Sequence, residues 1–285
     1  MSPGAFRIDA HQHYWKLAWS DYTWMQPHKA IQRDYGPEDL APLLQAAGIG
    51  GTVLVQADAT ERETDRLIEL ALRTPTVLGI VGWIDFTARD AVAEVERRAQ
   101  QPLLRGLRPM LELGDDPEWI LRPQIEPVLQ AMARMGLRFD ALIQPRHLPA
   151  IATLIERHPS LAVVIDHGGK PDLALREHQT DAFARWRDGM RALAAHSHVH
   201  CKLCGLLTQA PPDWASDDIV PAAETLLDLF GPDRLIWGSD WPVMTLAGTY
   251  QQWVEVTNQV LHGLTDAQRT AVWGGNAKRF YGLQR

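Results

Sequence analysis

Short runs of apolar and β-branched residues alternate with segments of helical periodicity along this 285-residue chain. Eight such runs predict strands, at 6–11, 52–56, 77–84, 104–110, 137–143, 161–167, 199–203 and 235–240. Helices are predicted after each strand, at 37–47, 61–73, 89–100, 123–135, 148–157, 181–195, 221–230 and 250–261. Strands that alternate with helices form parallel sheets through right-handed crossovers. The pattern therefore predicts an α/β fold, whose closed form is a (β/α)8 TIM barrel.

The same pattern predicts the domain organisation. No linker or low-complexity tract interrupts the alternation, so we expect residues 1–285 to form a single barrel domain, with 265–281 as a C-terminal helical appendage. A length of roughly 250 residues is typical of one α/β barrel. An open doubly wound sheet is the alternative, but no glycine-rich phosphate loop follows the first predicted strand.

Composition narrows the class of partner. Hydrophobic residues make up 46% of the chain and charged residues 22%, which is ordinary for a soluble globular protein. The net charge is −7 and the basic residues are scattered, which argues against nucleic acid or an anionic membrane as a partner and gives no signal of a subunit interface. No apolar signal segment or membrane-span run occurs, so we expect a cytoplasmic protein. Cys201 and Cys204 are interpreted as two unrelated thiols.

Two histidines, His11 and His13, close the first predicted strand. Residues two apart on a strand point to the same face, so both imidazoles are aimed at one point. Most isolated pairs of this kind are solvated or packed, but active-site groups of a barrel gather at its strand ends. There, His167 lies in Asp-His-Gly-Gly-Lys-Pro and Asp240 in Trp-Gly-Ser-Asp-Trp-Pro, each at the last position of its predicted strand. Three imidazoles and a carboxylate are typical ligands of catalytic zinc.

These motifs, together with Cys-Lys-Leu-Cys-Gly at 201–205, resemble the amidohydrolase superfamily. Within it, the chain is most similar to the branch of sugar lactonases and dicarboxylate-pyrone lactonases. The resemblance implies a distorted (β/α)8 barrel that hydrolyses an ester or amide at its mouth. It places His11, His13, His167 and Asp240 at the metal and catalytic positions.

The fourth predicted strand departs from a common pattern of the superfamily. Many amidohydrolases hold two metals bridged by a carbamylated lysine from this strand, but residues 104–110 contain no lysine. We therefore expect one zinc ion per site. Because some lactonases of this branch work without a metal, the resemblance leaves a metal-free pocket as the alternative.

Lactone hydrolysis needs an activated water, a group that stabilises the oxyanion and a proton for the leaving ring oxygen. We expect Asp240 to act as the general base, while zinc polarises the carbonyl or acidifies the water. Arg108 is expected to assist the oxyanion or anchor a hydroxyl, and a structural ion pair inside the barrel is its alternative role. The proton for the leaving alkoxide comes from Asp240 or from His28.

Aromatic residues at strand ends and in the long segment 14–36 are candidates for holding a sugar ring, with core packing as their alternative role. From the eleven tryptophans, we assign to substrate binding Trp15, Trp24, Trp83 and Trp241. Lys202 is a further candidate anchor, which inside a barrel would need a carboxylate partner such as Asp166 or Asp140.

Few arginines lie at the motif-bearing strand ends, which favours a neutral sugar lactone over a dicarboxylate. By resemblance, the first candidate substrate is L-fucono-1,5-lactone, hydrolysed to the aldonic acid. The alternatives are a 2-pyrone-dicarboxylate-type lactonase, a zinc-dependent decarboxylase of the same superfamily and, less favoured, a non-catalytic sugar-binding barrel.

Overall fold

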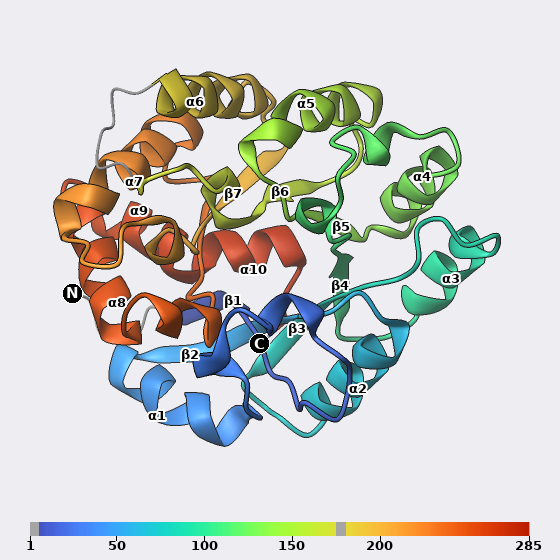
Figure 1. Cartoon of the computed structure of the whole chain (residues 1–285), viewed down its shortest axis with the longest axis horizontal. Coiled ribbons are helices and arrows are strands. Elements are labelled where there is room, and N and C mark those ends of the chain that lie inside the picture. Colours follow the sequence, from blue (N-terminus) through green and yellow to red (C-terminus); the bar gives the residue numbers. More distant parts are fainter. Residues whose placement is uncertain (1–5, 175–180, 285) are drawn as a thin grey trace.

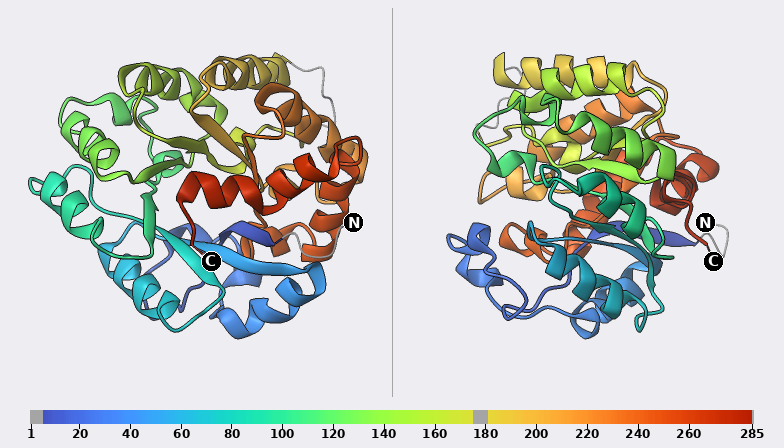
Figure 2. Two further views of the ribbon diagram at one scale, coloured as in Figure 1. Left: turned by 180° about the vertical axis from the view of Figure 1, so that it is seen from behind. Right: turned by 90° about the vertical axis from the view of Figure 1, so that its right-hand side faces the viewer.

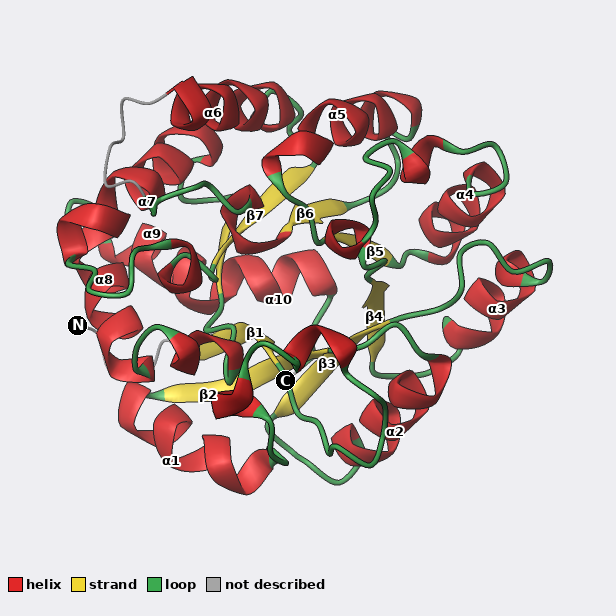
Figure 3. Ribbon diagram, viewed as in Figure 1, coloured by secondary structure: helices red, strands yellow, loops and turns green. Residues whose placement is uncertain are grey.

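A computed structural model describes residues 6–174 and 181–284. Its eight strands are parallel and follow one another in sequence order around a central axis (Figure 1). They are β1 Arg7–Gln12, β2 Ile49–Val55, β3 Val77–Gly82, β4 Leu104–Leu107, β5 Arg138–Ala141, β6 Val163–Ile165, β7 Val199–Leu203 and β8 Leu235–Trp237. The helices lie outside the strands (Figure 3). The prediction of a (β/α)8 barrel is confirmed.

The outer layer consists of α1 Pro37–Ala47, α2 Glu61–Ala71, α3 Ala91–Arg98, α4 Glu126–Met135, α5 Leu148–Arg157, α6 Asp181–Ala194, α7 Ser216–Phe230 and α8 Tyr250–Val260. Two further short helices, α9 Asp266–Thr270 and α10 Asn276–Tyr281, complete the described chain. Among the described residues, no helix is long and apolar enough to cross a membrane.

Helix α7 begins five residues earlier than predicted, at Ser216 rather than Pro221. The Asp218 carboxylate accepts a hydrogen bond from the Ala215 backbone N–H at 2.7 Å and so stabilises an upstream helix start. A proline is favoured in a first turn and disfavoured further in, which is why the sequence suggested the later start.

The barrel closes between β1 and β8 at their C-terminal ends. Gln12 and Trp241 form an isolated parallel bridge. The His13 backbone N–H donates to the Trp241 carbonyl at 2.7 Å, and the Asp240 backbone N–H donates to the His11 carbonyl at 2.8 Å. Closure of the barrel therefore brings the two histidines of β1 beside Asp240.

The two ends of the barrel are covered differently. The segment around residues 14–36 lies over one end and α10 lies over the opposite end, as the right-hand view of Figure 2 shows. One hydrophobic cluster fills the space between sheet and outer helices, and a smaller one joins strand residues such as Ile8 and Val164 to Phe280 and Tyr281. The cavity that contains the predicted site lies at the end away from α10.

Candidate active site

His167 and Asp240 lie in turns rather than in strands. β6 ends at Ile165 and β8 at Trp237, so the prediction that both residues occupy last strand positions is wrong. Both have left-handed backbone conformations, with φ of 54° at His167 and 62° at Asp240. Residues other than glycine rarely adopt this region, and those that do cluster at functional sites.

Two glycines make room for the histidines. A Cβ at Gly205 would lie 2.4 Å from His167 Nδ1, and a Cβ at Gly238 would lie 2.7 Å from the Cβ of His11. A larger residue would displace the His167 imidazole at position 205 and the backbone of His11 at position 238. Glycine in Cys-Lys-Leu-Cys-Gly and in Trp-Gly-Ser-Asp is thus explained by close packing around the site.

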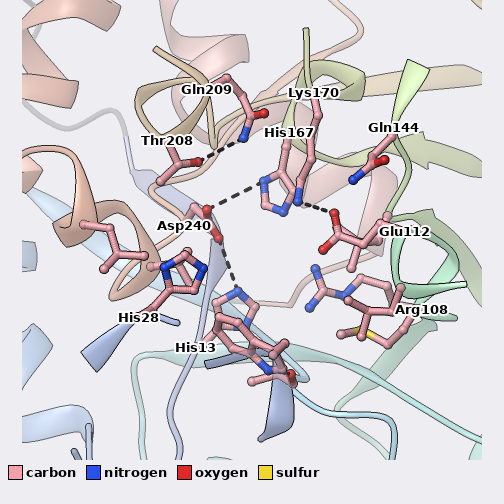
Figure 4. A pocket seen from close by; sticks show the side chains of 17 residues that line it. His13, His28, Arg108, Glu112, Gln144, His167, Lys170, Thr208, Gln209 and Asp240 are labelled. Atoms are coloured by element: carbon pink, nitrogen blue, oxygen red, sulfur yellow. Dashed lines mark hydrogen bonds and ion pairs between the residues drawn. The ribbon is translucent and has the colours of Figure 1, made fainter. Parts of the chain in front are cut away.

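Three imidazoles converge on the Asp240 carboxylate, and Figure 4 shows two of them, His13 and His167. Oδ1 lies 3.3 Å from His13 Nε2 and 3.8 Å from His11 Nε2, and Oδ2 lies 3.9 Å from His167 Nδ1. All four residues are buried. The structure therefore brings together the four residues that the sequence motifs singled out.

The geometry around His13 fits a cation. Its Nδ1 lies 2.8 Å from the Val55 carbonyl, which can only accept, so Nδ1 carries the hydrogen. In the neutral ring, Nε2 then presents a lone pair to Asp240 Oδ1, and two acceptors at 3.3 Å need a proton or a cation between them. A histidine whose other nitrogen donates to a carbonyl is typical of metal sites.

The wider donor set also suits one divalent metal. Ligand atoms of His11, His13 and Asp240 all lie within 4.8 Å of one another, as do those of His11, His167 and Cys204. Burial lowers the pKa of His11 and His167 well below the ordinary value, which maintains the neutral form that binds metals. Nitrogen, oxygen and sulfur donors in this number are those that zinc prefers.

Asp240 is ionised at neutral pH. Burial alone would raise the pKa of this carboxyl, but its interactions with His167, His13 and Lys170 outweigh burial and hold the pKa below the ordinary value. An ionised carboxylate in this place can ligate a metal or accept a proton from water.

The two cysteines have different surroundings. Both are buried free thiols, but Cys204 Sγ lies 3.2 Å from His167 Nδ1. Burial raises the pKa of the Cys204 thiol well above its ordinary value. Cys204 therefore lies beside the site, because β7 ends next to the turn that carries His167, a placement that the interpretation of two unrelated thiols did not address.

A cavity of about 330 Å³ opens above Asp240. Among the residues predicted for the site, those that line it are His13, Trp24, His28, Arg108, His167 and Asp240. Sequence reasoning missed or left unassigned five polar lining residues, namely Glu112, Gln144, Lys170, Thr208 and Gln209. Gln144 and Lys170 follow predicted strands closely and could have been found by that rule. Glu112 lies in a helical turn, Leu111–Leu113, that no pattern marks.

Three of the four predicted substrate-binding tryptophans lie elsewhere. Trp15 and Trp241 are buried on either side of Tyr35, with ring centroids 5.3 Å from it in both cases. Their predicted contact with substrate is therefore corrected to packing, because the long segment after β1 folds back onto the closing bridge. Trp83 lines a neighbouring cavity of about 510 Å³ together with Trp119.

Lys202 lies within the barrel, fully buried, and does not line the cavity. Its ammonium contacts both predicted partners, Asp140 Oδ2 at 2.6 Å and Asp166 Oδ1 at 2.9 Å, and lies 3.1 Å from His11 Nδ1. The prediction of a substrate anchor is corrected, since these contacts occupy the ammonium inside the protein. The hydroxyl of Tyr281 also donates to Asp140 Oδ2, at 2.6 Å.

Arg108 forms the structural ion pair that was its alternative role, and it also lies at the cavity. NH1 lies 3.3 Å from Asp166 Oδ2 and 3.3 Å from His11 Nε2, and NH2 donates to Gln56. The residue is thus part of a structural ion pair, yet its guanidinium also lies at the cavity (Figure 4). A cation held in this way is preorganised for a developing oxyanion.

Comparisons with known proteins agree with this architecture. The sequence profile of the amidohydrolase family matches residues 8–283. The chain is 44% identical to L-fucono-1,5-lactonase of Burkholderia ambifaria, over 98% of this chain and 97% of the relative. It is 38% identical to L-fucono-1,5-lactonase of Burkholderia multivorans, over 98% and 97%. A crystal structure of a Burkholderia multivorans amidohydrolase with bound zinc superposes with a TM-score of 0.91 at 36% identity, over 98% of this chain and 100% of that one. This chain belongs to the amidohydrolase family.

Proposed function

We propose that this protein hydrolyses a sugar lactone to the aldonic acid, with L-fucono-1,5-lactone as the first candidate. The observation that carries the proposal is the ionised Asp240 carboxylate, which faces three imidazoles at the floor of a cavity with polar side chains around it. Two relatives of 44% and 38% identity over nearly the whole chain are named as lactonases of this sugar. Each alignment covers 98% of this chain, and the residues that line the cavity come from positions 13 to 246.

The residues that would hold a metal are His11, His13, His167 and Asp240, and zinc is the metal we propose. When bound, it would acidify a water molecule and polarise the lactone carbonyl. The protein's own contribution is to keep the His11 and His167 imidazoles neutral by burial and to fix the His13 tautomer through the Val55 carbonyl.

The chain's own side chains supply the proton transfers. Asp240 accepts a proton from the attacking water as a new bond forms between the water oxygen and the carbonyl carbon. The guanidinium of Arg108 stabilises the negative charge on the carbonyl oxygen. When the bond between that carbon and the ring oxygen breaks, the proton held by Asp240 passes to the leaving alkoxide. Exposed His28 lines the same cavity and is the second candidate for this donor.

We place the reaction in the cytoplasm. Cys201 and Cys204 are free, and a reducing compartment keeps thiols in this state. The cavity of about 330 Å³ is in the lower range of ligand pockets and so suits a small molecule. The partner we propose is a neutral sugar lactone.

A panel of aldonolactones in weak buffer with a pH indicator tests this function. We expect the zinc-loaded protein to acidify the solution fastest with L-fucono-1,5-lactone and to release no carbon dioxide from aromatic carboxylates. Pyrone dicarboxylates in the same panel test the related lactonase activity. Failure to release acid from any aldonolactone above the uncatalysed rate would overturn the proposal.

A further inference from the structure

Glu112 and Lys170 form an ion pair across the active-site cavity (Figure 4). Glu112 comes from the helical turn after β4, and Lys170 follows the turn Asp166–Gly169 after β6. Both side chains line the cavity and are mostly buried, with 13% of the glutamate and 20% of the lysine side chain exposed. None of the proton transfers proposed above uses this pair.

The pair belongs to a balanced set of charges. Among the described residues that line the cavity, the carboxylates are Glu112 and Asp240 and the permanent cations are Arg108 and Lys170. Arg108 is already bound to Asp166 at 3.3 Å, and Lys170 is already bound to Glu112. A carboxylate on a substrate would therefore find Lys170 already paired and would meet the Glu112 carboxylate beside it.

The backbone fixes Glu112 in this place. Arg146 NH2 donates to the carbonyl of Glu112 and to that of Gly114, both at 3.0 Å. The neighbouring Leu111 is buried, so the turn is held from both sides. A charged group held by backbone contacts of this kind suits recognition, because little order has to be gained when a ligand binds.

We propose that the Glu112–Lys170 pair makes this site selective for uncharged lactones, a specificity that rests on the proposed lactonase function. Glu112 accepts hydrogen bonds from sugar hydroxyls, Lys170 donates to them, and the Glu112 charge excludes lactones that carry a carboxylate. Discrimination of this type depends on a repulsive element as much as on an attractive one.

The test compares Glu112→Gln with wild type on two matched substrates. Galactono-1,4-lactone and galactaro-1,4-lactone share a ring and differ in a hydroxymethyl group against a carboxylate. In wild type, we expect kcat/KM for the neutral lactone to be at least a hundredfold higher. In the variant, the lysine is free to pair with the substrate, so kcat/KM for the carboxylated lactone rises at least tenfold. The neutral lactone shows a higher KM and a kcat within threefold of wild type.

Asp115→Asn is the matched control. It removes the same charge from the same loop, but Asp115 lines the neighbouring cavity rather than this one. We expect this variant to keep the wild-type ratio between the two substrates. Lys170→Gln is the reciprocal variant, because it leaves Glu112 without its cation. We expect it to lower kcat/KM for the carboxylated lactone below the wild-type value.

Three results would overturn the selectivity. One is a wild-type enzyme that hydrolyses both lactones at similar rates, which needs no variant. The second is an unchanged ratio in a folded Glu112→Gln protein, and the third is an equal change in Asp115→Asn. Each leaves the lactonase function standing, whereas a wild type inactive on every neutral aldonolactone removes the function itself.

Discussion

Asp240 and Asp140 are both buried carboxylates of one barrel, but their surroundings differ. At the cavity, Asp240 faces His13, His11 and His167 at 3.3 to 3.9 Å, and the contact with His13 joins acceptor to acceptor when that ring is neutral. Deeper inside, Asp140 Oδ2 receives the Lys202 ammonium and the Tyr281 hydroxyl, both at 2.6 Å. The first carboxylate is left for a cation, water or substrate, whereas the second is occupied by the protein.

We therefore assign Asp240 to the chemistry of the site and Asp140 to the stability of the barrel. Burial would lower the pKa of Lys202, but Asp140 and Asp166 raise it, so the ammonium stays charged in the interior. Removing one member of such a buried group leaves another charge unpaired, which is costly. Removing the Asp240 carboxylate instead takes away an acceptor that faces the lone pair of His13. The loss of Asp240 should therefore affect chemistry far more than folding.

Asp240→Asn tests whether Asp240 acts in chemistry rather than in folding, and we expect it to have the greatest effect on activity. Asp240→Asn should lower kcat for the lactone by about 10²- to 10⁴-fold, because an amide cannot accept the proton from water. With metal removed from both proteins, the unfolding midpoint should stay within a few degrees of wild type, measured by circular dichroism. A variant that keeps more than a tenth of wild-type kcat would remove Asp240 as the base.

Lys202→Met should destabilise the protein by disrupting the buried ion pairs of Lys202 with Asp140 and Asp166. The substitution leaves Asp140 and Asp166 buried without their shared cation and should cost about 3–5 kcal/mol of unfolding free energy. Urea denaturation measures this loss. Lys16→Met is the control, since this lysine is exposed and should change stability by less than about 0.5 kcal/mol. Equal effects of the two substitutions would end the distinction between the two groups.

Metal removal tests whether the residues around Asp240 hold a metal ion. If zinc is held by the residues proposed, a chelator should lower the stability of wild type by about 3–4 kcal/mol when the metal had been present at several hundred times its Kd. The same treatment should barely change the unfolding midpoint of His13→Ala. Stripped wild-type protein that is as stable and as fast as the loaded enzyme would exclude a role for the metal.

Tyr281→Phe tests whether the hydrogen bond from Tyr281 to Asp140 stabilises the fold. The variant keeps the ring but loses the hydrogen bond to Asp140, so we expect a loss of about 1–2 kcal/mol in unfolding free energy. Lactonase activity at saturating substrate should remain within twofold. A large fall in kcat with unchanged stability would mean that this hydroxyl acts on the site rather than on the fold.

The smallest expected effect is a flat pH profile. Asp240 has a pKa held below 3.8, so its active, ionised form is lost only as pH falls through that lower value. Burial lowers the pKa of His11 and His167 well below 6.5, so both rings are neutral at pH 7 and their protonation is shifted to lower pH. We therefore expect kcat/KM to be nearly constant between pH 7 and pH 5. An acidic limb near pH 6 would assign the essential proton acceptor to another group.

The barrel and its four central residues were predictable, because strand alternation and the motifs around His11, His13, His167 and Asp240 are local patterns. The turn conformations of His167 and Asp240 were not, because apolar periodicity continues past the point where strand pairing stops. Glu112 also escaped prediction, since its position depends on how Arg146 holds a helical turn.

The contact between Tyr281 and Asp140 shows the same limit, because it joins residues 141 positions apart. It also has a consequence for synthesis. Every strand of the barrel leaves the ribosome before Tyr281 does, so the nascent barrel holds Asp140 and Lys202 without this last hydroxyl. In the folded protein α10 lies over this end of the barrel, where Asp140 and Lys202 are fully buried. Closing this end therefore depends on a helix that is synthesised after every strand of the barrel.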